Sequence, residues 1–213
     1  MTTPHPAKYS DVLLTYFDRL LPPDSELILD PFAGTGKLRL IRPHCVLIEL
    51  EPEWARISQA IVGDATALPF ANETFAAICT SPTYGNRMAD NFTDHRPDKH
   101  YKRYTYRHML GRPLSQNNSG GMQWGKAYRD LHLKAWKECD RVLRPGGILL
   151  INISDHIRSG HIVPVTDWHL TCLTNMGYVL QEHLRVATRR QRHGQNGQLR
   201  VDHESILVLT KAA

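Results

Sequence analysis

The stretch Asp30-Pro31-Phe32-Ala33-Gly34-Thr35-Gly36 decides the fold of this chain. Its acidic first residue closes a short apolar run, residues 27–29, and the glycines that follow predict a tight turn. Such a turn lets a nucleotide-like ligand approach the backbone closely at the end of a strand, because glycine carries no side chain. The pattern therefore predicts a strand-to-loop junction in an α/β protein, with a ligand site at the loop.

Strand and helix patterns alternate along the rest of the chain. We expect strands at 26–29, 46–48, 61–62, 75–80, 148–151, 178–186 and 205–210, and helices at 9–21, 53–60, 128–143 and from 166 to just before Gly177. Few residues separate Gly36 from the second strand, so the first crossover helix, 37–41, should be truncated. Pro145-Gly146-Gly147 should separate the long helix from the fifth strand. The alternation predicts a mostly parallel sheet with helices on both faces and an antiparallel last pair of strands.

Polar residues follow four of the expected strands at their carboxyl ends: Asp30, Glu49, Asp64 and Ser81. The carboxyl ends of parallel strands meet at one edge of a sheet, where ligands bind in α/β folds. Taken singly, Glu49 and Asp64 are equally well explained as helix-capping carboxylates. Their spacing along successive strands favours a single ligand site.

A second motif, Ser81-Pro82-Thr83-Tyr84, directly follows the expected strand at 75–80. Together with residues 30–36 it resembles the two signature motifs of S-adenosylmethionine-dependent methyltransferases that act on exocyclic amino groups of nucleobases, the DNA N4-cytosine and N6-adenine enzymes. The resemblance implies the class I methyltransferase fold, a Rossmann-like sheet of seven strands. The short run His5-Pro6-Ala7-Lys8-Tyr9 resembles that family's remaining cofactor motif, in the γ order, although a merely packed N-terminus also explains it.

The resemblance implies S-adenosylmethionine as cofactor, with its ligands at Lys8, Tyr9, Asp30, Pro31, Phe32, Ala33, Gly34, Gly36, Glu49, Asp64 and Ala65. Glu49 is placed to accept the ribose hydroxyl protons, as acidic residues do at this position in dinucleotide folds. Asp64 would accept from the adenine amino group. Asp30 and the backbone of residues 32–36 would meet the methionine tail.

The resemblance also implies the catalytic residues Ser81, Pro82 and Tyr84. The Ser81 hydroxyl and the Pro82 carbonyl would accept the two amine hydrogens, while Tyr84 stacks on a base that is flipped out or already single-stranded. Direct displacement requires neither a metal nor a covalent nucleophile. Thr83 stands where the family has a second proline, which leaves the rigidity of the loop open. Asp155, after the fifth strand, is explained as well by a capping role as by a catalytic one.

Charge favours a polyanionic partner. The 213 residues include 26 Lys and Arg against 21 Asp and Glu, for a net charge of +5 and a pI near 9.1. An insertion at 85–126 carries eight Lys or Arg interleaved with Tyr and His, and a second basic run spans 185–200. Cations beside aromatic rings suit phosphates and stacked bases, although a solvated lid is the simpler alternative for the insertion.

We therefore expect DNA as the partner rather than RNA, and cytosine N4 as the target, because serine in the first position of the motif is more typical of N4 enzymes. N6-adenine, RNA and a catalytically silent nucleic-acid-binding module remain alternatives. One domain, 1–213, accounts for the length. The four cysteines form no CxxC pair, and no apolar stretch suits a membrane span or a leader, so we expect a cytoplasmic protein without membrane partners. The compact form suits a bacterial or phage modification enzyme.

Overall fold

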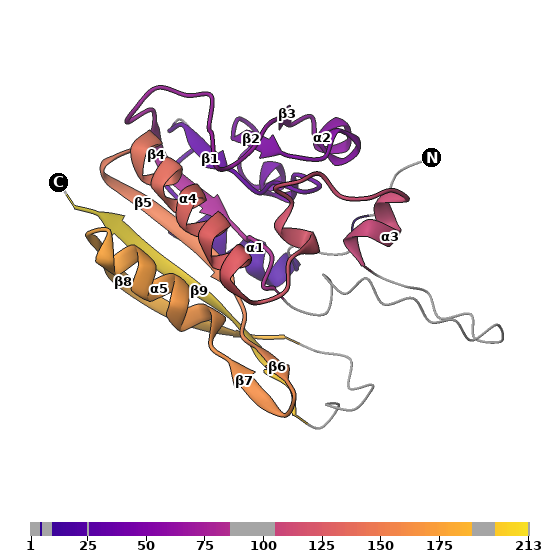
Figure 1. Cartoon of the computed structure of the whole chain (residues 1–213). Helices are drawn as coiled ribbons and strands as arrows, with labels where there is room; N and C mark the ends of the chain where they lie inside the picture. Colours follow the sequence, from indigo (N-terminus) through magenta and orange to yellow (C-terminus); the bar gives the residue numbers. More distant parts are fainter. Residues whose placement is uncertain (1–4, 6–9, 25, 86–104, 189–198, 213) are drawn as a thin grey trace.

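A seven-stranded sheet forms the centre of the molecule (Figure 1). The computed structural model describes residues 5, 10–24, 26–85, 105–188 and 199–212. Among them, the sheet has the order β3-β2-β1-β4-β5-β9-β8. Its strands are β1 (Ile28–Asp30), β2 (Val46–Glu49), β3 (Ile61–Val62), β4 (Phe75–Thr80), β5 (Leu143–Ile153), β8 (Tyr178–Ala187) and β9 (His203–Lys211). Strands β1 to β5 pair in parallel, and β9 is antiparallel to both β5 and β8. The predicted fold class is confirmed.

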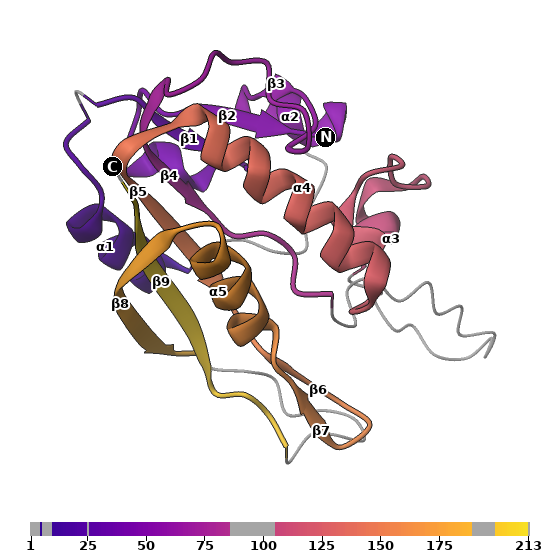
Figure 2. The same ribbon diagram turned by 60° about the vertical axis from the view of Figure 1, so that its left-hand side comes forward.

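Helices cover both faces of this sheet (Figure 2). They are α1 (Asp11–Leu20), α2 (Pro52–Ser58), α3 (Tyr106–Leu110), α4 (Lys126–Val142) and α5 (Val165–Asn175), with 3-10 turns η1 (Lys37–Leu40) and η3 (Ser119–Gly121). Alternate residues of β4 face opposite sides, as the two-residue period of a strand requires. Ile78 belongs to the core beneath α4 and α5, whereas Ala77 and Cys79 belong to the core beneath α1 and η1. Burial on both faces explains why these strands are apolar throughout.

The first crossover is truncated, as expected. A 3-10 turn, η1, replaces a full helix between β1 and β2. Gly36 precedes it in the left-handed conformation, at φ +71°. A Cβ at Gly36 would lie 2.7 Å from Ser58 Cβ and 2.9 Å from Leu47 Cδ1. The short connection therefore depends on glycine both for backbone conformation and for the close approach of α2.

The fifth strand differs from the expectation. It begins at Leu143, directly after α4, and Pro145-Gly146-Gly147 lies inside it rather than before it. Phe75 pairs with Leu143 while Ala77 pairs with Ile148, so residues 144–147 form an irregularity opposite a single residue. Gly146 takes φ +72°, which permits the bend without ending the strand.

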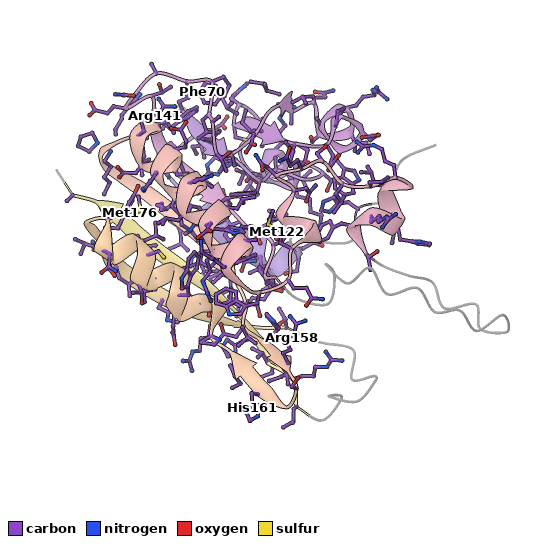
Figure 3. All side chains as sticks on the ribbon, in the orientation of Figure 1. Phe70, Met122, Arg141, Arg158, His161 and Met176 are labelled. Carbon is purple, nitrogen blue, oxygen red and sulfur yellow. The ribbon has the colours of Figure 1, made fainter. Side chains whose placement is uncertain are left out.

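A short hairpin of β6 (His156–Arg158) and β7 (His161–Val163) projects from the sheet, and the sequence did not predict it. Arg158 and His161 lie on it, and Arg141 lies beside Phe70 at the opposite end of the molecule (Figure 3). Arg141 Nη1 donates to the Phe70 carbonyl at 2.7 Å, which ties the loop after β3 to α4. Asp155 Oδ1 accepts the backbone N–H of Thr166 at 2.8 Å, in the first turn of α5, and so takes the capping role.

No helix in the described ranges is long and apolar enough to cross a membrane. Cys45, Cys79, Cys139 and Cys172 are all free thiols. The first three are buried in the core, where they serve as small apolar side chains.

Candidate active site

A cavity of about 340 Å³ lies at the carboxyl ends of the parallel strands. The predicted residues that line it are Pro31, Phe32, Ala33, Gly34, Glu49, Asp64, Ala65, Ser81, Pro82 and Tyr84. Both predicted motifs therefore open into one space. Asp30 and Gly36 lie outside the lining, and Lys8 and Tyr9 lie outside the described residues.

Asp30 is fully buried behind the loop of residues 31–36, which we call the glycine loop. Its Oδ1 accepts from Thr80 Oγ1 at 2.7 Å and from the Phe32 backbone N–H at 3.1 Å. These bonds join the ends of β1 and β4 and fix the start of the loop. In this structure Asp30 shapes the cavity from behind rather than lining it.

Glu49 holds the middle of the same loop. Its Oε2 accepts the Gly34 backbone N–H at 2.9 Å, and its Oε1 accepts the Glu51 backbone N–H at 2.8 Å. Gly34 has φ +53°, and a Cβ there would lie 3.2 Å from the His5 ring. Burial raises the pKa of the Glu49 carboxyl to about 7, against the opposing effect of the two backbone hydrogen bonds. Each oxygen keeps a second lone pair for a hydroxyl donor.

Asp64 is oriented from two sides. Its Oδ1 accepts from both the backbone N–H and the hydroxyl of Thr66, each at 2.8 Å. Its Oδ2 accepts from Asn117 Nδ2 at 2.6 Å. Asn117 belongs to a segment that lies far along the chain and also lines the cavity. Sequence reasoning did not find this contact.

Glu51 anchors the segment that carries Asn117, residues 112–119. Sequence reasoning did not identify Glu51. Its side chain is fully buried. One oxygen accepts from the Ser115 backbone N–H at 2.8 Å and from Asn118 Nδ2 at 2.7 Å. The other accepts from Arg112 Nη2 at 2.8 Å and from Ser115 Oγ at 3.0 Å. The only sequence signal was an acid just before Pro52 and α2, which resembles a helix cap.

Aromatic rings form another part of the wall. His5, Trp54 and Tyr106 all line the cavity. The His5 ring meets Trp54 edge to face with centroids 4.5 Å apart, and Tyr106 with centroids 5.5 Å apart. Of the N-terminal motif, His5 is the residue that the structure describes, and it lies at the cavity as that motif predicts.

Polar side chains cluster at the loop that follows β4, residues 81–84, which we call the Ser81 loop. Strands β5 and β9 contribute Asn152 and Glu204 to this cluster. Ser81 Oγ lies 3.2 Å from Tyr84 Oη, and Asn152 Nδ2 lies 3.3 Å from Ser81 Oγ and 3.1 Å from Tyr84 Oη. Glu204 Oε2 accepts from Asn152 Nδ2 at 2.7 Å and from Tyr84 Oη at 3.3 Å. All four residues line the cavity. Sequence reasoning did not find Glu204.

Thr83 is held in place by both its side chain and its backbone. Its hydroxyl donates to Ser119 Oγ at 2.8 Å, and its carbonyl accepts from Tyr128 Oη at 2.5 Å. Tyr128 Oη also lies 3.0 Å from His169 Nε2, and Trp136 Nε1 donates to His169 Nδ1 at 3.0 Å.

This buried chain has a fixed order of donors. An indole N–H only donates, so His169 Nδ1 must accept and the Nε2–H must donate to Tyr128. Burial holds the pKa of His169 well below its ordinary value, so the ring is neutral. Tyr128 then gives its one proton to the Thr83 carbonyl. These bonds hold both the side chain and the carbonyl of Thr83 in place.

The basic residues are described only in part. Arg107 and Arg185 are exposed, and Arg200 is half-buried. Lys99, Lys102, Arg103 and residues 189–192 lie outside the described residues.

Comparison with known proteins identifies the family. Residues 75–213 match the N6/N4 methyltransferase family, described as DNA methylase. The chain belongs to this DNA methylase family. No curated protein matches the sequence at a significant level.

Solved structures share the fold. An S-adenosylmethionine-dependent methyltransferase from Methanosarcina mazei aligns with TM-score 0.58 and 11% identity over 97% of this chain and 99% of that chain. The N-methyltransferase NodS from Bradyrhizobium japonicum aligns with TM-score 0.55 and 15% identity over 95% and 96%. The [4+2]-cyclase SpnF aligns with TM-score 0.56 and 16% identity over 95% and 79%. At these identities the likeness concerns the fold alone.

The chain is therefore an S-adenosylmethionine-dependent methyltransferase of the class I fold, and S-adenosylmethionine is its cofactor. The donor set of the cavity fits this molecule. Glu49 and Asp64 offer carboxylate oxygens to hydroxyl and amino donors, and the glycine loop brings backbone close to the same space. The aromatic wall of Trp54 and Tyr106 offers apolar surface beside them.

We expect the affinity for S-adenosylmethionine to depend on pH through Glu49. With a pKa of about 7, the carboxyl is ionised above pH 7 and protonated below it. Only the ionised form has acceptors for both ribose hydroxyls, so affinity should fall by about tenfold between pH 8 and pH 6. Calorimetric titration across this range checks the expectation. Glu49→Gln should bind more weakly at pH 8 and lose the pH dependence; a wild-type affinity that is constant with pH would contradict the role.

Proposed function

We propose that this methyltransferase transfers a methyl group from S-adenosylmethionine to an exocyclic amino group of a DNA base, with cytosine N4 preferred. The observation that carries the proposal is the convergence of the Ser81 loop and the Glu49–Asp64 end on one cavity. S-adenosylmethionine supplies an electrophilic methyl group on a sulfonium. The protein must then align an amine with it and accept the amine hydrogens.

The Ser81 loop suits that task. Ser81 Oγ and the Pro82 carbonyl offer oxygen acceptors at the cavity, and Tyr84 offers a ring whose hydroxyl is held by Asn152 and Glu204. A base that stacks on this ring has to leave its duplex or be single-stranded already. The bonds to Thr83 favour an active enzyme over a silent binding module, because they keep the loop fixed without the second proline.

DNA as the substrate rests on the family and on charge. The family is described as DNA methylase, and the net charge of +5 favours a polyanion. Exposed Arg107 and Arg185 are cations available for phosphates. Preference for cytosine rests on Ser81, since serine in this position is more typical of N4 enzymes.

The test is incubation with labelled S-adenosylmethionine and separate pools of DNA and RNA, followed by nucleoside analysis. We expect N4-methylcytosine from DNA. N6-methyladenine would leave the reaction class intact and overturn the preference drawn from Ser81. If the labelled methyl group appears in RNA and not in DNA, the proposal of DNA as the substrate is overturned. If the protein binds both ligands and yields no methylated base, the silent-module alternative is correct.

A further inference from the structure

Glu204 brings a carboxylate to the target end of the cavity. It lies at the start of β9, whose antiparallel pairing with β5 sets Ser205 opposite Ile153. That register places Glu204 at the carboxyl end of the parallel strands, next to Asn152 and the Ser81 loop. The other carboxylates that line the cavity, Glu49 and Asp64, lie at the ends of β2 and β3, with the glycine loop and Asn117.

The carboxylate fixes the direction of two hydroxyl groups. An ionised carboxylate only accepts, so Tyr84 Oη must donate to Glu204 Oε2 across their 3.3 Å contact. Tyr84 Oη then has no proton left for Ser81, so the 3.2 Å contact between them requires Ser81 Oγ to donate to Tyr84. The lone pairs of Ser81 Oγ are left to accept. A single chain of donors thus runs from Ser81 through Tyr84 to Glu204.

Asn152 supports the same direction. Its Nδ2 has acceptors on Ser81, Tyr84 and Glu204, the shortest bond being the 2.7 Å contact with the carboxylate. Its Oδ1 is buried and has no hydrogen-bond partner among the described residues. Asn152 is 1% exposed. A buried amide oxygen without a donor is costly.

We propose that Glu204 is the final acceptor of the proton that the amine loses on methylation, and that the proton reaches it through the hydroxyls of Ser81 and Tyr84. The inference rests on the proposed function, since it needs an amine at the Ser81 loop. A protonated hydroxyl group is a far stronger acid than a carboxylic acid, so a proton that enters this chain passes on to the carboxylate. Catalytic hydrogen bonds of this length shorten when substrate binds.

The step balances. The amine nitrogen uses its lone pair to form the bond to the methyl carbon, and the carbon–sulfur bond breaks with its electron pair left on sulfur. The nitrogen passes its extra proton to Ser81 Oγ, as the Ser81 proton moves to Tyr84 Oη and the Tyr84 proton moves to Glu204. Both hydroxyls end unchanged. Glu204 ends as a neutral acid, and since it is half-buried it releases the proton to solvent.

The test is a double-mutant cycle under single-turnover conditions, with cofactor and DNA saturating. Glu204→Gln and Tyr84→Phe each remove the relay while they keep the size of the side chain. We expect each to slow transfer by about tenfold to 100-fold, the lower end of what a general base contributes. The double variant should be no slower than the slower single variant, because either change alone interrupts the same path. Affinities for cofactor and DNA, measured separately, should stay within about twofold.

Glu182→Gln is the matched control. It makes the same chemical change on neighbouring β8, at an exposed site, and should leave the rate unchanged. If the double variant loses as much rate as the product of the two single losses, the two residues act independently and the relay is overturned. So would a Glu204→Gln variant that transfers at the wild-type rate, or one whose only defect is weaker DNA binding. A wild-type protein that methylates no base would overturn the proposed function and the relay together, whereas the other outcomes overturn the relay alone.

Discussion

Replacing Glu51 with alanine is expected to lower the free energy of unfolding by about 3 kcal/mol, because hydrogen bonds to a charged group contribute about 1.5–3 kcal/mol each and several are lost together. The side chain is fully buried and accepts four hydrogen bonds from Arg112, Ser115 and Asn118. Without it, the backbone N–H of Ser115 loses its acceptor, and Arg112 keeps Glu53 and the Pro113 carbonyl as partners. For a chain of this size the loss corresponds to a fall of about 6–12 °C in Tm. Thermal and urea unfolding measure both quantities.

Glu53→Ala is the natural control, because Glu53 binds the same guanidinium from a position that is partly exposed to solvent. Its oxygens accept from Arg112 at 2.8 and 2.6 Å, yet its side chain is 33% exposed. Exposed pairs contribute less than about 1 kcal/mol, so this variant should be nearly as stable as wild type. Equal losses in the two variants would show that Glu51 does not anchor the segment.

Glu51→Ala should also weaken the binding of S-adenosylmethionine, although Glu51 does not line the cavity. The segment that it anchors carries Asn117, Asn118 and Ser119 to the lining, and Asn117 orients Asp64. A cofactor affinity that stays at the wild-type level in a destabilised variant would separate the segment from the site.

The edge of the sheet that carries the site could be predicted because its determinants are local. Each strand is an apolar run ended by a polar residue, and the parallel arrangement follows from the alternation with helices. The pairing of β1 with both β2 and β4 is what brings Asp30, Glu49 and Ser81 to one edge. The truncated crossover between β1 and β2 could also be predicted, because the number of residues between two strands limits the length of the helix between them.

The long-range contacts that complete the site could not be predicted from such local patterns. Glu51 meets Ser115 and Asn118 across more than 60 residues of chain, and no periodicity marks the segment that carries them. Glu204 reaches the Ser81 loop only because of the register between β5 and β9, and a shift of one residue would turn it to the other face. Such contacts depend on tertiary packing, so a sequence pattern identifies a carboxylate without its partner.

The predicted start of β5 was wrong for a similar reason. Pro145-Gly146-Gly147 is a strong signal for a break in regular structure. The sheet absorbs it as an irregularity between the pairs Phe75–Leu143 and Ala77–Ile148. Strand pairing on both sides of the glycines outweighs the local preference of the three residues.

Tyr84→Ala is expected to give the largest loss of methyl transfer. The substitution removes the ring that stacks on the target base, which is worth about 1–3 kcal/mol, and removes the hydroxyl held by Asn152 and Glu204. Stacking alone corresponds to a loss of about 5-fold to 150-fold in rate when it holds the amine in line. Single-turnover assays with saturating cofactor and DNA measure this loss without the contribution of binding.

Comparison with Tyr84→Phe and Ser81→Ala separates the contributions of the ring and the hydroxyl. Tyr84→Phe keeps the ring, so it should transfer faster than Tyr84→Ala by the stacking factor. Ser81→Ala removes the oxygen that accepts an amine hydrogen, and should slow transfer with near-normal affinity for S-adenosylmethionine, because the stabilisation grows as the nitrogen becomes cationic. If Tyr84→Ala and Tyr84→Phe transfer at the same rate, the ring does not position the base. The hydrogen bonds of Tyr84 would then carry its whole contribution.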